Sequence, residues 1–132
     1  MLSLFKILFA TFSVVLFVSN AGAGTAGPTD ADIKSHISKK EEASATGVGS
    51  SHKSATLTFE SIKIGKARKA TDRDRLVNGI TGPVVYPVRV RYTSNRVWGN
   101  GSKESKTIFY EYEFFKDSFD EWNSYMVGPV KN

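Results

Sequence analysis

The chain has 132 residues, a formal net charge of +5 at pH 7 and no cysteine. The missing cysteine excludes disulfides, a thiolate zinc site, thiol catalysis and a lipid-modified N-terminal cysteine. The positive charge favours anionic neighbours without naming one. A chain of this length is expected to form one small domain held together by core burial alone.

The first 23 residues predict an export signal. Lys6 and the amino terminus supply positive charge, and the apolar segment Ile7–Val18 is shorter than a typical membrane-spanning helix. Small residues favour cleavage after Ala23, with Ala21 as an alternative site and an uncleaved anchor as the competing interpretation. Loss of Lys6 would lower the formal charge from +5 to +4. The mature chain is therefore expected in a bacterial periplasm or outside the cell.

After the signal, residues 24–28 are expected to form a flexible leader and residues 29–132 a single domain. Thr29 is a typical N-cap, and Asp30 and Asp32 fall in the first turn, where the helix dipole favours negative charge. Asp32 also approximates a capping box. The predicted helix ends near 43–45, before a Gly/Ser-rich loop. Ile33, His36, Ile37 and Lys40 recur every three or four residues, so they are predicted to share one face of this helix.

A strand is predicted over Ala55–Gly65, although its apolar residues change phase halfway. A bulge near Glu60-Ser61 would bring both sets to the core side. These apolar residues are Leu57, Phe59, Ile62 and Ile64. The polar segment Lys66–Pro83 then reads as a long connection or a ragged hairpin.

Two further runs, Val84–Tyr92 and 107–115, alternate regularly on either side of an Asn100-Gly101 turn signal. If they pair antiparallel, their inner faces carry Val84, Tyr86, Val88, Val90 and Tyr92, and Ile108, Tyr110, Tyr112 and Phe114. On the outer face, Arg89 and Arg91 are predicted to meet Glu111 and Glu113. Pro87 has no N–H to donate, so the first strand is expected to lie near an edge or to be interrupted there.

The last segment predicts a turn over Lys116–Asp120 and a strand over Glu121–Val127. A short helix capped by Asp117 is the competing interpretation. The predicted fold class is α+β, with one N-terminal helix packed on a curved antiparallel sheet of about four strands.

This order resembles the cystatin-like and NTF2-like superfamily from Asp30 to about Val127, and "FFKDSFDEW" is similar to the final hairpin of small exported bacterial members. The chain has no glutamine and no Pro-Trp, which cystatin protease inhibitors use, so inhibition by that route is not expected. The resemblance to NTF2-like enzymes implies a cavity inside the sheet. Tyr86, Tyr110 and Tyr112 would line it.

Catalytic motifs are missing from the sequence. It has no G-x-S-x-G elbow, no His-Glu-x-x-His pair and no P-loop. His36 and His52 have no carboxylate at a spacing that suggests a partner, so both are expected to be structural or solvated. Asp72 and Asp74 alternate with arginines, which disfavours metal binding. No catalytic residue, metal or cofactor is therefore predicted.

A run of cations is the candidate contact surface: Lys63, Lys66, Arg68, Lys69, Arg73 and Arg75. Trp98, beside the hairpin tip, is expected to be exposed and to join it. These residues predict a non-catalytic envelope module that contacts an anionic or protein partner, including a membrane surface, through the cations and a sheet edge. Nucleic acid is disfavoured because no aromatics are interleaved. The alternative function is a small-molecule binder or enzyme with the tyrosine-lined pocket.

Overall fold

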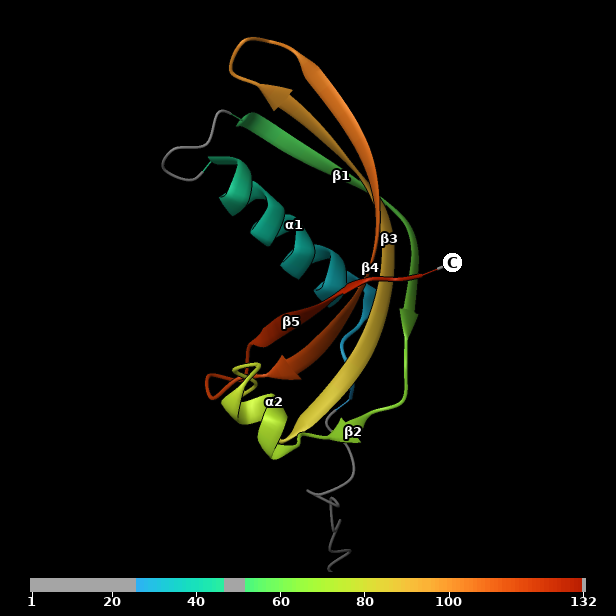
Figure 1. Ribbon diagram of the computed structural model, residues 1–132, viewed down its shortest axis with the longest axis vertical. Coiled ribbons are helices and arrows are strands. Elements are labelled where there is room, and N and C mark those ends of the chain that lie inside the picture. The colour runs from blue at the N-terminus through green and yellow to red at the C-terminus, as the bar shows by residue number, and fades with distance from the viewer. Residues whose placement is uncertain (1–25, 47–51, 132) are drawn as a thin grey trace, which may run out of the picture.

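The computed structural model describes residues 26–46 and 52–131, so the predicted signal segment lies outside the described residues (Figure 1). Strands β1, β3, β4 and β5 form an antiparallel sheet in that order, and β2 pairs with β3. The elements are α1 (Asp30–Thr46), β1 (His52–Ile64), β2 (Arg68–Lys69), α2 (Asp72–Leu76), β3 (Val84–Trp98), β4 (Lys103–Lys116) and β5 (Trp122–Pro129). The predicted α+β class is confirmed.

Helix α1 begins at the predicted cap. The Thr29 hydroxyl accepts the N–H of Asp32 at 3.2 Å, and the Asp32 carboxylate accepts the N–H of Thr29 at 2.9 Å. These reciprocal bonds satisfy two of the N–H groups that a helix start leaves unpaired. Just before the cap, Gly27 lies so close to Tyr86 that a Cβ would meet its ring at 2.9 Å. The last residues of the predicted leader therefore pack on the domain.

The main core lies between α1 and one face of the sheet, which we call the inner face. Ile33 and Ile37 of α1 are fully buried there. Figure 1 shows the sheet curving around the helix. The predicted inner faces of β3 and β4 are confirmed, with Val84 and Tyr110 partly buried at the margin. The buried sheet residues are Tyr86, Val88, Val90, Tyr92, Ile108, Tyr112 and Phe114.

Strand β1 contains the predicted bulge. Its pairing with β3 shifts by one residue between Phe59 and Ser61, which leaves Glu60 as the extra residue. Because side chains alternate between the two faces of a strand, one extra residue returns the second half of β1 to the core side. Leu57, Phe59 and Ile62 pack against the core, whereas Ile64 is exposed.

Pro87 lies within β3, which has neighbours on both sides, but at Pro87 itself only β4 is paired, so the strand has a local edge there, as predicted. The interruption belongs to the neighbouring strands, because β1 ends at Ile64 and β2 begins only at Arg68. The N–H of Gly65 donates to the Pro87 carbonyl at 2.7 Å. Pro87 therefore faces the gap between β1 and β2, where its missing N–H costs no ladder bond.

On the outer face, one predicted ion pair forms and the other does not. Arg89 Nε lies 2.9 Å from Glu111 Oε2, as predicted. Arg91 instead lies opposite Phe109, with its guanidinium 5.2 Å from the ring centroid. Antiparallel strands run in opposite directions, so the residue two after Arg89 faces the residue two before Glu111. The predicted contact of Arg91 with Glu113 is therefore wrong.

The connection between β1 and β3 is folded on the outer face. Thr71 caps α2, because its hydroxyl accepts the N–H of Asp74 at 3.2 Å and its own N–H donates to the Asp74 carboxylate at 2.7 Å. A second, smaller core packs beneath this segment, formed by Ala70, Ile80, Val85 and Phe115 with Tyr125 beside them. Neither a long loop nor a ragged hairpin describes it.

Strands β3 and β4 run further than predicted, so the loop between them shrinks to a tight turn. Gly101, at φ 84°, donates its N–H to the Trp98 carbonyl at 2.9 Å. At the other end of β4, the Asp117 carboxylate accepts the N–H groups of Phe119 at 2.9 Å and Glu121 at 3.0 Å. Strand β5 follows, which confirms the predicted strand over the competing short helix.

Replacing Phe114 by alanine is expected to lower the free energy of unfolding by about 3 to 5 kcal/mol, because its ring is 0% exposed in the main core. Phe119→Ala is the matched control, since that ring is 83% exposed and its loss should cost about 0.5 kcal/mol or less. Urea titration measures both. Equal, small losses would show that Phe114 is not in the core.

Candidate functional site

The predicted run of cations follows the end of β1, the gap, β2 and α2, in the lower part of Figure 1. One member, Arg68, is only half-exposed, and the other five are exposed. We call these five the basic surface: Lys63, Lys66, Lys69, Arg73 and Arg75. Lys63 projects from the outer face of β1, and α2 packs over the second core on the same side, so most of the basic surface lies there. Lys69 is the exception, because it pairs with Val84 and projects toward the inner side.

Arg68 has a structural role that the sequence did not reveal. Its guanidinium binds the buried Asp74 carboxylate through two bonds of 2.7 and 3.1 Å and reaches Glu113 on β4 at 2.7 Å. The bonds from Arg68, followed by the N–H of Thr71, hold the pKa of Asp74 well below its usual range. Arg68 therefore joins α2 to the sheet and contributes little free charge to the basic surface.

The basic surface is largely uncompensated. Arg75 pairs with Asp72 at 3.4 Å, at an exposed position where such a pair is weak. In residues 26–46 and 52–131, no carboxylate lies within ion-pair distance of the other four cations. These side chains are therefore available to bind an anion from outside the chain.

A cleft of about 270 Å³ lies at one end of this surface, at the gap that follows β1, and Lys63 is the member of the basic surface that lines it. It contains two cations, Lys63 and Arg89, and one carboxylate, Glu111, which already pairs with Arg89. The backbone comes close here because Gly65 has no side chain: a Cβ would lie 3.2 Å from the Pro87 carbonyl oxygen. The gap opposite Pro87 thus forms a hollow next to Lys63, whose charge is the one in the lining that no carboxylate there offsets.

Apolar side chains stand next to the cations of α2. Leu76 is 85% exposed and Val77 is 69% exposed, directly after Arg73 and Arg75 in the chain. Neighbouring apolar side chains exposed to this degree are free to contact a partner or an apolar layer. The basic surface therefore combines cations with apolar groups that project into solvent.

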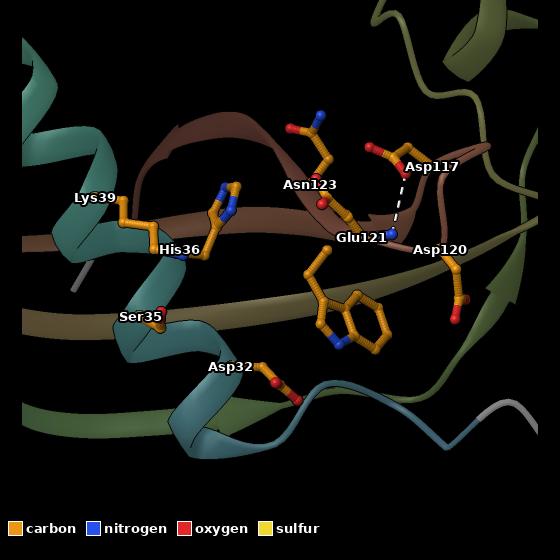
Figure 2. Close-up of a pocket in the computed structure, with 9 residues that line it drawn as sticks. Asp32, Ser35, His36, Lys39, Asp117, Asp120, Glu121 and Asn123 are labelled. Atoms are coloured by element: carbon orange, nitrogen blue, oxygen red, sulfur yellow. Dashed lines mark hydrogen bonds between the residues drawn. The ribbon is translucent and has the colours of Figure 1, made fainter.

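A second, larger cleft of about 500 Å³ lies between α1 and the turn that joins β4 to β5 (Figure 2). Figure 2 shows side chains of α1 facing those that precede and begin β5. The cleft is lined by Asp32, Ser35, His36, Lys39, Asp117, Asp120, Glu121, Trp122 and Asn123. Its four carboxylates exceed its cations, so its charge is opposite to that of the basic surface.

His36 lines this cleft, but its Nε2 is hydrogen-bonded within the protein. Its Nε2 lies 2.9 Å from Ser124 Oγ on β5, and Lys40 Nζ donates to the same hydroxyl at 3.1 Å. Burial, followed by the charges of Lys40 and Lys39, lowers the pKa of His36 below its usual 6.5. Ser124 is 8% exposed. This contact therefore ties α1 to the last strand, a structural role that fits the prediction for His36.

The tyrosines predicted to line a pocket are mostly in the core. Tyr86 and Tyr112 are 8% and 5% exposed, and Tyr110 is half-buried with its ring centroid 6.4 Å from that of Tyr112. The larger cleft is lined by other side chains. Trp98 is half-buried, so the prediction that it would be exposed is wrong. His52 begins β1, and its side chain lies outside the described residues.

A half-buried polar contact that the sequence did not predict holds α1 to β3. Tyr92 Oη donates to Glu41 Oε1 at 3.1 Å, and Arg96 reaches Glu41 Oε2 at 3.1 Å. Burial raises the pKa of Tyr92, so this hydroxyl keeps its proton. The available signal was spacing, because Glu41 follows Ile37 by four residues and continues the buried stripe of the helix.

Comparison of the chain with protein-family models, curated proteins and solved structures found no match in any of the three. Within the described part of the chain, no three His, Asp or Glu residues gather closely enough to hold a metal ion. No helix of residues 26–46 and 52–131 has the length and apolar character needed to span a membrane.

Arg68→Met is expected to lower the free energy of unfolding at pH 7 by about 2 kcal/mol. The value is smaller than for a fully buried pair because the Arg68 side chain is 36% exposed. In the unfolded chain Asp74 has its ordinary pKa near 3.8, above its folded pKa. The pair therefore stabilises fully above pH 3.8 and less as the pH falls further. Urea titrations at pH 7 and pH 3 should show the difference from wild type shrinking in acid.

Arg73→Met is the matched control, since Arg73 has no carboxylate partner among the described residues. It should change stability by about 0.5 kcal/mol or less at either pH. Equal effects at Arg68 and Arg73 would contradict the structural role of Arg68.

The stability of the domain is expected to decrease as the pH falls from about 7.5 to 5.5. In this range the unfolded chain protonates His36 near pH 6.5, whereas the folded chain resists protonation because the ring is partly buried. His36→Gln should flatten this pH dependence in urea titrations. An unchanged slope in the variant would assign the dependence to other groups.

Proposed function

We propose that this protein is an exported, non-catalytic binding module of the cell envelope and that its partner is an anionic lipid headgroup layer. The observation that carries the proposal is the basic surface, where five cations are exposed and four of them lack a carboxylate partner within the described residues. The export signal predicted over residues 1–23 and the resemblance in element order to small exported cystatin-like and NTF2-like proteins support an envelope location.

The exposed apolar side chains favour a lipid layer over a soluble anion. A headgroup layer offers phosphates to Arg73 and Arg75 and an apolar interior to Leu76 and Val77, which follow them directly. Each Lys or Arg near an anionic leaflet contributes about 1 kcal/mol. Several cations together with two inserted aliphatic side chains would give reversible, salt-dependent attachment.

Several titratable groups are hydrogen-bonded within the protein, which favours a binding function over catalysis. His36 and Lys40 both bind Ser124, which is 8% exposed and offers little access to a substrate. Asp117 accepts two backbone N–H groups of its own turn. These groups stabilise the fold, because their polar atoms bind other groups of the protein even where they line the larger cleft.

The alternative function is small-molecule binding, and the larger cleft is its best location. Its volume of about 500 Å³ is within the range of ligand sites, and Trp122 offers an aromatic surface. This differs from the predicted tyrosine-lined pocket, because Tyr86 and Tyr112 are buried. A ligand for this cleft would have to tolerate four carboxylates, so it would be cationic or neutral.

The triple variant Lys66→Ala, Lys69→Ala and Arg73→Ala is expected to bind vesicles that contain phosphatidylglycerol roughly 100-fold more weakly than wild type. Three lost cations at about 1 kcal/mol each amount to about 3 kcal/mol, and 1.4 kcal/mol is a factor of ten. Co-sedimentation at low and high salt measures the change. Binding by wild type should weaken steeply with salt.

The matched control removes three exposed cations elsewhere, in Lys34→Ala, Lys39→Ala and Lys131→Ala. It has the same net charge as the first variant but keeps the basic surface, so its loss should be about tenfold or less. Equal losses in the two variants would mean that overall charge, and not this surface, drives binding. No binding of wild type to anionic vesicles would refute the proposed function.

A further inference from the structure

Half of β4 has a free edge. Strand β5 pairs with β4 only from Tyr110 to Lys116, whereas β3 pairs with β4 from Lys103 onward. Beyond β5, the N–H of Val130 reaches the Phe109 carbonyl at 2.9 Å. Within the described part of the chain, no strand covers the other side of Lys103–Ile108, which we call the open edge. Figure 1 shows that this part of the β3–β4 hairpin extends past α1.

The backbone polarity of the open edge follows from the Phe109 contact. The Phe109 carbonyl points away from β3, toward the side where β5 lies. In an antiparallel sheet, the N–H and C=O of one residue point to the same side, and successive residues alternate. Lys103, Ser105 and Thr107 therefore direct their N–H and C=O groups outward from the open edge. Such a row of unpaired groups is a template for another strand.

The charges on the open edge fit a second copy of the same strand. Lys103, Glu104 and Lys106 are exposed, and none forms an ion pair with any described residue. If two copies pair antiparallel with Ser105 opposite Ser105, then Glu104 of each copy lies opposite Lys106 of the other. A two-fold axis moved by one residue would place Glu104 opposite Glu104 or Lys106 opposite Lys106, and like charges opposite each other are destabilising.

We propose that the partner of the open edge is a second copy of this chain, and that the two copies join their sheets by antiparallel pairing of β4 about a two-fold axis at Ser105. The contact is isologous, as in most homodimers. It requires no backbone rearrangement, because the outward groups of Lys103, Ser105 and Thr107 are those that bond across the axis. Glu104 and Lys106 provide two ion pairs that fix the register.

Dimerisation would place the two basic surfaces on the same side of the joined sheet. This step alone rests on the proposed function. Residues opposite each other in an antiparallel pair project to the same face of a sheet. The outer sides of both copies therefore lie on one side of the joined sheet, and both basic surfaces face the same way. Two such surfaces could contact one lipid layer together, which raises the apparent affinity without any new contact.

The test is sedimentation velocity of the purified protein, without vesicles, over concentrations up to the millimolar range. Wild type should form a concentration-dependent dimer. Glu104→Lys and Lys106→Glu each place like charges opposite each other twice, so each should weaken dimerisation by about tenfold or more. The double variant with both changes restores opposite charges and should recover the dimer.

Two further variants keep the result interpretable. Lys103→Glu changes an exposed charge on the same strand but lies opposite Thr107 in the proposed register, so dimerisation should change by about twofold or less. Ser105→Pro removes an N–H that points to the open edge and should abolish the dimer, with urea titration confirming that the variant is folded. A wild type that stays monomeric at every concentration, or a double variant that fails to recover, would overturn the proposal.

Discussion

The pairing of β3 with strands on both of its sides determines the rest of the fold. Because β3 is hydrogen-bonded along both edges, each of its side chains must belong to one face or the other, and the alternation from Val88 to Tyr92 makes one face a core. A slip of one residue would bury Arg89 and Arg91 and expose the apolar set. The bulge at Glu60 lets β1 follow this register although its apolar residues change phase.

Helix α1 packs on this sheet through few apolar side chains and several polar contacts. Only two isoleucines of the helix are fully buried, so the apolar contact is narrow. Polar contacts complete it, with Glu41 bound to Tyr92 and Arg96, and with His36 and Lys40 bound to Ser124. These contacts have a desolvation cost, seen in the lowered pKa values of His36 and Lys40. The helix is therefore positioned by specific directional bonds more than by burial.

Local patterns in the sequence predicted what depends on neighbouring residues, including the cap at Thr29, the bulge at Glu60 and the facing of the hairpin strands. They missed the outer half of the hairpin, because residues 93–98 and 103–106 have no apolar alternation and are held by backbone pairing. In the candidate site, the cations were predicted from their clustering between Lys63 and Arg75 in the sequence. The structural role of Arg68 could not be predicted in this way, because its partner Glu113 lies 45 residues away in the chain.

The bond between His36 and Ser124 joins residues 88 positions apart, and Lys40 reaches the same serine across 84 positions. During synthesis α1 is made before β5, so its contacts with β1 and β3 can form before its contact with Ser124. A chain that has been made only as far as β4 therefore lacks the residue that both His36 and Lys40 bind. Until β5 is made, the attachment of α1 rests on its two buried isoleucines and on the bonds of Glu41 to β3.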